Sequence, residues 1–214
     1  LDEKEYLKYL DLVCIGTISD IVPLVDENRV IAKLGLKLIE QTKNIGLRTL
    51  LNIANFKKID SNAISFGVAP RINACGRMGA QEEALKLFLT EDKQEALKIA
   101  KNLVKFNQER QNTEKQIFED VIQEIEKNND KEKKCIVLAK ENWHHGIIGI
   151  VSSKVTEMYY KPSILICLEG DMGKGSGRSV PGFDLYNALS KCNNYIEKFG
   201  GHSMAIGISI KKEN

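Results

Sequence analysis

The sequence lacks several features that would assign it to a common class of protein. No hydrophobic run approaches the roughly 20 residues that cross a bilayer, and the charged start LDEKEYLKYL is unlike a signal peptide. The five cysteines are scattered, odd in number and without a C-x-x-C pair, which argues against both a disulfide framework and a zinc site. We therefore expect a cytoplasmic protein, without a membrane partner, whose thiols are reduced and mostly buried.

The sequence also has no excess of charge of one sign. Its 214 residues include 31 basic and 29 acidic side chains, which leaves a net charge of +2. This balance excludes binding to nucleic acid through an overall basic field, so any such surface must be a local patch. The chain begins with Leu rather than Met, and we interpret it as a piece cut from a longer polypeptide.

Hydrophobic spacing predicts a mainly helical first half. Residues 5–24 fit a helix slightly better than a strand, and residues 27–42 and 46–55 have helical spacing. Residues 60–82 contain glycines, a proline and two arginines, and we expect a shaped loop there. A long helix is predicted from an N-cap at Thr90 to about residue 128. A helix of this length often joins two domains.

The second half has the rhythm of an α/β domain. Strands are predicted at residues 134–140, 162–170 and 205–212, with helices at 146–160 and 184–196. Residues 174–180 are a strand or a loop. Strands that alternate with helices indicate an α/β fold, with a mixed sheet covered by helices.

The densest local pattern is GKGSGRSVPG at residues 173–182. It matches neither the Walker A loop nor G-x-G-x-x-G. Bare backbone amides, the hydroxyls of Ser176 and Ser179 and the charges of Lys174 and Arg178 suit phosphate oxygens. A tight turn with solvated basic side chains explains the spacing equally well.

Two further glycine–histidine stretches accompany this pattern. In FGGHSMAIG, residues 199–207, a short helix is expected after His202, whose imidazole would donate to an anion at the helix start; a plain turn is the alternative. In ENWHHGIIGI, residues 141–150, Trp143 either stacks on a base or fills the core. His144 and His145 are expected to diverge, which disfavours a shared metal.

Two stretches of the first half carry charged candidates. FGVAPRINACGRMG, residues 66–79, places Arg71 and Arg77 around Asn73, and such a pair either clamps a phosphodiester backbone or is merely solvated. In GTISDIVPL, residues 16–24, Asp20 interrupts an apolar stretch. Because Asp is seldom buried alone, we expect Asp20 to be hydrogen-bonded, to cap a helix or to bind a cation. One carboxylate does not make a catalytic metal site.

Together with NQERQNTEKQ in the long helix, these stretches resemble the RecJ single-strand-specific exonucleases of the DHH phosphoesterase superfamily, in the same order and at similar separations. The resemblance spans essentially the whole chain. It implies a nuclease that degrades single-stranded DNA 5′ to 3′ in repair and recombination. It also implies two divalent metals, Mn²⁺ or Mg²⁺.

The resemblance also implies roles and boundaries. Asp20 would be the catalytic aspartate of the fourth metal motif. The residues that would contact the nucleic acid are Arg71, Asn73, Arg77, Lys174, Ser176, Arg178, Ser179 and His202. Residues 1–82 would end the catalytic DHH domain, 83–130 would form the connecting helix region, and 131–214 would form the DHHA1 substrate-binding domain.

The chain departs from this family in one large respect. The earlier metal motifs, including the Asp-His-His triplet, are missing, as is the OB-like domain of many members. The resemblance therefore implies an internal fragment that mainly binds the strand and is inactive alone. The alternatives are a DHHA1-type module of a short-oligonucleotide phosphodiesterase or of an alanyl-tRNA synthetase, and a scaffold with exposed basic loops.

Overall fold

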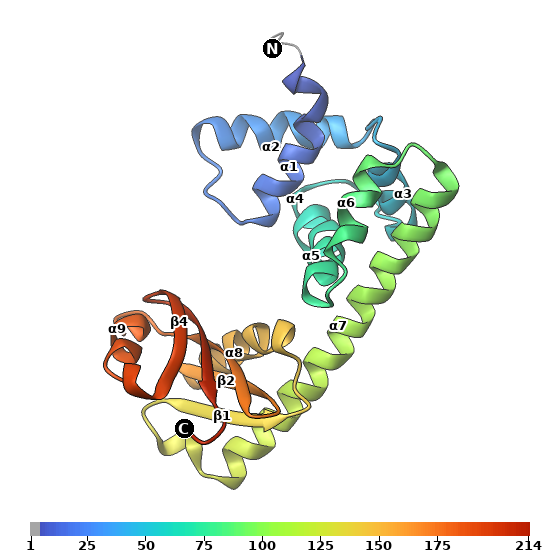
Figure 1. Ribbon diagram of the computed structural model, residues 1–214. Helices are drawn as coiled ribbons and strands as arrows, with labels where there is room; N and C mark the ends of the chain where they lie inside the picture. Colours follow the sequence, from blue (N-terminus) through green and yellow to red (C-terminus); the bar gives the residue numbers. More distant parts are fainter. Residues whose placement is uncertain (1–4) are drawn as a thin grey trace. The chain divides into compact units, whose positions relative to one another are not determined.

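The structure is a computed structural model that describes residues 5–214. The chain divides into two compact units, one up to Glu109 and the other from Arg110 onward (Figure 1). The division falls inside the long helix α7, Lys93–Lys127. No helix within the described residues combines the length and the apolar character needed to cross a membrane.

The first unit is helical, as its hydrophobic spacing predicts. A 3-10 turn at Tyr6–Tyr9 leads into α1, and short helices then follow up to the start of α7. Asn44 caps α3 by accepting a hydrogen bond from the Leu47 amide at 2.8 Å. The helices are α1 Leu10–Ser19, α2 Asp26–Ile39, α3 Ile45–Ala54, α4 Ser61–Ala63, a π-helical stretch Ile64–Val68, α5 Ala69–Arg77 and α6 Gln81–Leu89.

The expected loop over residues 60–82 is wrong, because most of this stretch is helical. Pro70 lies in the first turn of α5, directly after the π-helical stretch, so the helical run continues through a residue without an amide donor. Gly67 is explained by packing, since a β-carbon there would lie 2.1 Å from Cζ of Phe56. The residues that suggested a loop are thus consistent with a helix.

The expected N-cap of the long helix is also wrong. Thr90 ends α6, which the sequence did not predict as a separate helix. Asp92 performs the capping, because its Oδ1 accepts from the amides of Gln94 at 2.6 Å and Glu95 at 3.2 Å. The C-terminal end near residue 128 is confirmed at Lys127.

The second unit is an α/β domain, and its mixed sheet is confirmed. Within the described residues, five strands lie in the order β1-β2-β3-β5-β4, with β1 and β2 parallel and the other pairs antiparallel. The elements are β1 Ile136–Glu141, α8 His145–Tyr159, β2 Ser163–Glu169, β3 Met172–Arg178, α9 Leu185–Ser190, β4 Ile196–His202 and β5 Ala205–Lys211. The glycine-rich segment is therefore a strand inside the sheet (Figure 1).

The helix expected after His202 is wrong. Residues 196–211 form a β-hairpin, in which β4 and β5 pair directly across a short turn. The predicted helix at 184–196 is shorter, since α9 ends at Ser190. Asp184 caps α9 by accepting from the Asn187 amide at 2.9 Å.

Candidate nucleic-acid interface

Strand β3 separates the glycines of its motif from the polar residues, because successive side chains point to opposite faces. Gly173, Gly175 and Gly177 point to the face that α9 covers, where isoleucines of the neighbouring strands fill the space above them. A β-carbon on Gly175 would lie 2.6 Å from Cγ1 of Ile208. Packing against isoleucine therefore accounts for the glycines that the sequence associated with a phosphate.

The polar residues of β3 point to the opposite face and continue across the hairpin. Residues directly opposite one another in a ladder share a face, and the register therefore gives three rows over β3, β5 and β4. The rows are Lys174–Ser209–Lys198, Ser176–Gly207–Gly200 and Arg178–Ala205–His202. We call this surface the polar sheet face.

The polar sheet face thus joins four of the predicted residues, Lys174, Ser176, Arg178 and His202, and adds Lys198, which the sequence interpretation missed. His202 is exposed, and its Nδ1 accepts from the Met204 amide at 3.3 Å in the hairpin turn. His202 therefore reaches this face through strand pairing and not through a helix terminus.

Arg178 is held in a fixed position on this face. It is half-buried, and its Nη1 donates to Ser176 Oγ at 3.1 Å and to the Gly177 carbonyl at 2.8 Å. Gly149 of α8 lies beside both side chains, since a β-carbon there would be 2.9 Å from Ser176 Oγ. A guanidinium held in this way suits a phosphate because little side-chain freedom is lost on binding.

Ser179 has a structural role in the described chain. Its side chain is buried, its Oγ donates to the Phe183 carbonyl at 2.7 Å, and its amide donates to the Met204 carbonyl at 2.9 Å. Ser179 thereby fixes the loop that follows β3. Beside it lies a groove of about 270 Å³ with a lining of Ser153, Thr156, Glu157, Arg178, Ser179, Met204 and Ala205.

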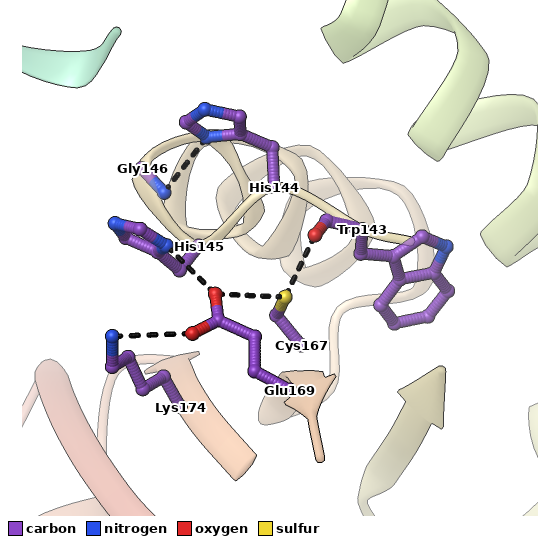
Figure 2. Close-up of polar contacts among 7 residues, drawn as sticks. All are labelled: Trp143, His144, His145, Gly146, Cys167, Glu169 and Lys174. Carbon is purple, nitrogen blue, oxygen red and sulfur yellow. Dashed lines mark hydrogen bonds and ion pairs between the residues drawn. The ribbon is translucent and has the colours of Figure 1, made fainter. Parts of the chain in front are cut away.

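Glu169 partly neutralises the other end of the polar sheet face. Its Oε2 lies 3.3 Å from Lys174 Nζ, and its Oε1 lies 3.1 Å from His145 Nδ1 (Figure 2). The hydrogen bonds with His145 and Lys174 lower the pKa of the Glu169 carboxyl, so Glu169 is a carboxylate at neutral pH. A strand phosphate at Lys174 would compete with this carboxylate.

The expected divergence of the two adjacent histidines is wrong, because their rings stack with centroids 5.3 Å apart (Figure 2). His144 caps α8, and its Nδ1 accepts from the Gly146 amide at 3.1 Å. Burial, together with the neighbouring His145, lowers the pKa of His144. His144 is therefore neutral at pH 7 and acts as a cap.

Trp143 fills the core, as one of its two interpretations predicts. It is buried, and its Nε1 donates to Asp120 Oδ2 at 2.7 Å. Its carbonyl accepts from the Cys167 thiol at 2.7 Å (Figure 2). Burial raises the pKa of the Cys167 thiol, so this sulfur is a packing group rather than a nucleophile.

In the first unit, Asp20 is exposed at the C-terminal end of α1. Within residues 5–214 its carboxylate has no hydrogen bond or ion pair, so it caps nothing. Gly16 lies one turn earlier on the same helix face, and a β-carbon there would meet nothing within 4 Å. The buried carboxylate of this helix is Asp11, which accepts from the Thr42 hydroxyl and from the Leu12 amide at 2.8 Å.

The predicted pair of arginines lies on different faces of α5. Asn73 and Arg77, four residues apart, share an exposed face. Arg71 is half-buried, donates from Nη1 to the Gly67 carbonyl at 2.6 Å, and stands 6.0 Å from the ring centroid of Phe56. Burial lowers the pKa of its guanidinium. Arg71 therefore acts at least partly in packing.

A metal centre needs several ligands that converge on one point. Across residues 5–214, no group of three or more His, Cys, Asp or Glu side chains converges in a way that would hold a metal ion. Asp20 therefore stands without further acidic or imidazole ligands in the part of the chain that the structure describes.

Comparisons with known proteins agree on one family. Residues 132–214 match the DHHA1 domain. The single-stranded-DNA-specific exonuclease RecJ of Bacillus subtilis is 38% identical over 209 residues, which are 96% of this chain and 26% of that protein. RecJ of Dickeya dadantii is 32% identical over 224 residues, which cover 100% of this chain and 39% of that protein.

Solved structures give the same result for the fold. The crystal structure of RecJ in complex with Mg²⁺ from Thermus thermophilus matches with a TM-score of 0.87 and 32% identity, over 97% of this chain and 32% of that one. A crystal structure of exonuclease RecJ bound to manganese matches with a TM-score of 0.87 and 34% identity, over 97% of this chain and 51% of that one. The chain thus spans between about a quarter and two fifths of the length of the curated relatives cited above.

Proposed function

Because the chain belongs to the RecJ family, we propose that it is the strand-binding part of a longer exonuclease that degrades single-stranded DNA 5′ to 3′ in the cytoplasm, in DNA repair and recombination. Residues 1–82 would form the end of the DHH domain, 83–130 the connecting helix region and 131–214 the DHHA1 domain. Single-stranded DNA is then the partner of this chain.

The polar sheet face is the observation that carries the proposal. It brings Lys174, Ser176, Arg178 and His202 to one side of one sheet, although His202 lies 24 residues after Arg178 in the sequence. Guanidinium, ammonium and hydroxyl groups bind phosphate oxygens, and they do so without reading the base. Such a surface suits an enzyme that must hold a strand of any sequence.

The first unit would supply the remaining contacts of the proposal. Asn73 and Arg77 on the exposed face of α5 are suited to a phosphodiester backbone. Gly76 lies on the same face, and a β-carbon there would meet nothing within 4 Å, so this helix offers close approach to its backbone. Arg71, which packs on Phe56, would act by supporting α5.

A divalent metal, Mg²⁺ or Mn²⁺, belongs to the proposed activity of the longer protein. The described residues do not fit a complete two-metal site, because Asp20 supplies one carboxylate and no other ligand converges on it. We propose Asp20 as one ligand whose partners lie outside this chain. The chain alone is then expected to bind single-stranded DNA without hydrolysing it when Mn²⁺ or Mg²⁺ is added.

Binding to a labelled oligothymidylate, measured by fluorescence anisotropy, tests the proposal. Arg178→Ala should weaken binding by about 1–3 kcal/mol, as expected for a lost charge-assisted hydrogen bond. Affinity should also fall steeply as salt is raised. Lys191→Ala is the matched control, because Lys191 is exposed and follows α9, which packs on the opposite face of the sheet.

Two results would contradict the proposal. Unchanged binding by Arg178→Ala would leave only a scaffold with exposed basic loops. Cleavage of the labelled strand by the purified chain with added Mn²⁺ would show that the metal ligands are present after all. The alternative as a module of a short-oligonucleotide phosphodiesterase is not favoured, because the curated relatives cited above are exonucleases named for single-stranded DNA.

A further inference from the structure

A groove of about 340 Å³ lies on the polar sheet face, at the end away from Arg178. Its lining comes from all three strands and consists of Lys174, Gly175, Lys198, Phe199, Gly200, Gly207, Ile208 and Ser209. Lys174, Ser209 and Lys198 form one row across it in the ladder register. Two ammonium groups and a hydroxyl therefore lie in a row across one shallow groove.

Two glycines of this groove are not explained by the fold. Gly200 and Gly207 are directly opposite each other. A β-carbon on Gly200 would meet nothing within 4 Å, and one on Gly207 only the Gly175 carbonyl at 4.0 Å. Neither has a positive φ. Gly201 differs, because its φ is +137° and a β-carbon there would lie 2.2 Å from the Ala205 carbonyl.

Glycine inside a strand weakens the strand unless something approaches the backbone closely. Within the second unit, no side chain approaches Gly200 or Gly207 within 4 Å from the polar sheet face. The bare backbone of Gly200 and Gly207 forms the floor of the groove, and this floor is open to a group from outside the chain. The lysines at its edge indicate that this group is anionic.

The row spacing fits a nucleotide chain. Rows two residues apart are separated by about 6.8 Å along a strand, so the Lys174–Lys198 row and the Arg178–His202 row lie about 14 Å apart. The glycine row lies midway between them. Neighbouring phosphates of a single strand are only about half this distance apart, so phosphates at the two charged rows would be two nucleotides apart, and the intervening sugars and phosphate would lie over the bare backbone.

Lys198 is the better placed of the two lysines to bind an anion. Lys174 forms an ion pair with Glu169, with 3.3 Å between Nζ and Oε2, which partly neutralises its charge. Lys198 is exposed and has no ion pair within the described residues. Its neighbour Glu197 is directed elsewhere, since its Oε1 lies 3.7 Å from Lys211 Nζ.

We propose that this groove is a nucleotide subsite, in which Lys198 binds a phosphate of the single strand and the Gly200–Gly207 floor admits the adjoining sugar and base. The proposal rests on the proposed function and extends the strand contacts to a second phosphate, two nucleotides from the one at Arg178. It predicts that the two parts of the subsite have different signatures: Lys198 acts through charge and the glycines through space.

The experiment measures anisotropy of labelled oligothymidylates of increasing length, over a range of salt concentrations, together with thermal unfolding. Lys198→Ala should weaken binding to the longer strands about tenfold and reduce the log–log salt slope by about 0.7. Gly207→Ala should weaken binding several-fold with the salt slope unchanged, and its unfolding midpoint should be equal or higher because alanine suits a strand better than glycine.

Each outcome decides between the subsite and the proposed function. If Lys198→Ala and Gly207→Ala bind like Lys191→Ala while Arg178→Ala is weaker, the subsite is wrong and the proposed function stands. If Arg178→Ala is also unchanged, or if the chain binds no strand at low salt, both are wrong. Should Gly207→Ala fail to fold, the floor is required by the fold and its proposed role is wrong; Lys198→Ala still decides the phosphate contact.

Discussion

Gly149 of α8 leaves the space in which the Arg178 guanidinium lies. A β-carbon at position 149 would be 3.2 Å from Arg178 Nη2 and 2.9 Å from Ser176 Oγ. Glycine inside a helix is unfavourable by about 1 kcal/mol relative to alanine. Glycine at position 149 therefore lowers the stability of α8 but leaves room for the Arg178 guanidinium.

Gly149→Ala should separate these two effects. The gain in helix propensity offsets the contact with two side-chain ends, so the free energy of unfolding should change by less than about 1 kcal/mol. Strand binding should weaken several-fold, because Ser176 Oγ, which accepts from Arg178, must shift and the guanidinium itself must give by a few tenths of an ångström. Thermal unfolding and anisotropy of a labelled oligothymidylate measure the two quantities. Wild-type affinity in a folded Gly149→Ala variant would contradict this account.

Glu169→Gln should strengthen strand binding. The substitution removes the negative charge beside Lys174 and His145 while it keeps a polar side chain of the same size. We expect a gain of about threefold at low salt that disappears at high salt, since the pair is exposed. Glu132→Gln, which makes the same change of net charge at an exposed site in the turn before β1, is the control. If the control gained the same affinity for the strand, the effect of Glu169→Gln would be due to net charge alone.

The sequence predicted the α/β class because short apolar runs, typical of strands, alternate with longer stretches of helical spacing in its second half. The structure has strands and helices in this order. The prediction failed where a residue has two physical meanings. Gly67 and Pro70 suggested a loop, yet Gly67 accommodates the ring of Phe56 and Pro70 lies in the first turn of α5. Which residue packs against each glycine depends on the tertiary structure and cannot be predicted from the spacing of residues in the sequence.

The missed part of the site follows from one wrong element. A helix was expected after His202, and KFGGH at residues 198–202 was therefore not predicted as a strand. Alternation along a strand places Lys198, Gly200 and His202 on one face. The signal was present in the sequence, but the register that joins it to Arg178 through β5 is set by long-range pairing.

Thr42→Val should destabilise the first unit. The Thr42 hydroxyl donates to Asp11 Oδ2, and both residues are buried. Valine keeps the shape but leaves a buried carboxylate oxygen without its donor and the Asn44 amide, at 3.1 Å from the hydroxyl, without its acceptor, which together cost about 1–3 kcal/mol. Denaturant unfolding measures the change. Thr49→Val, whose hydroxyl bonds to the Ile45 carbonyl of its own helix at 2.8 Å, should cost clearly less. Equal losses would contradict a stabilising role for the Thr42 hydroxyl between Asp11 and Asn44.

Asp120 should give the second unit a stability that depends on pH. Burial alone would raise the pKa of its carboxyl, but the hydrogen bonds from Lys140 Nζ, at 2.5 Å, and Trp143 Nε1, at 2.7 Å, hold it below the ordinary value. A carboxyl whose pKa is lower in the folded state stabilises the fold fully above its unfolded pKa of about 3.9, and this stabilisation is lost as the pH falls through the folded pKa.

Asp120→Asn should therefore cost about 1–2 kcal/mol at pH 7 and progressively less below about pH 4, as measured by denaturant unfolding at each pH. Glu119→Gln, at the neighbouring exposed position, is the control, and its free energy of unfolding relative to the wild type should not change in this way with pH. If Asp120→Asn instead cost the same at every pH, the charge of Asp120 would not be what stabilises Trp143 in the core.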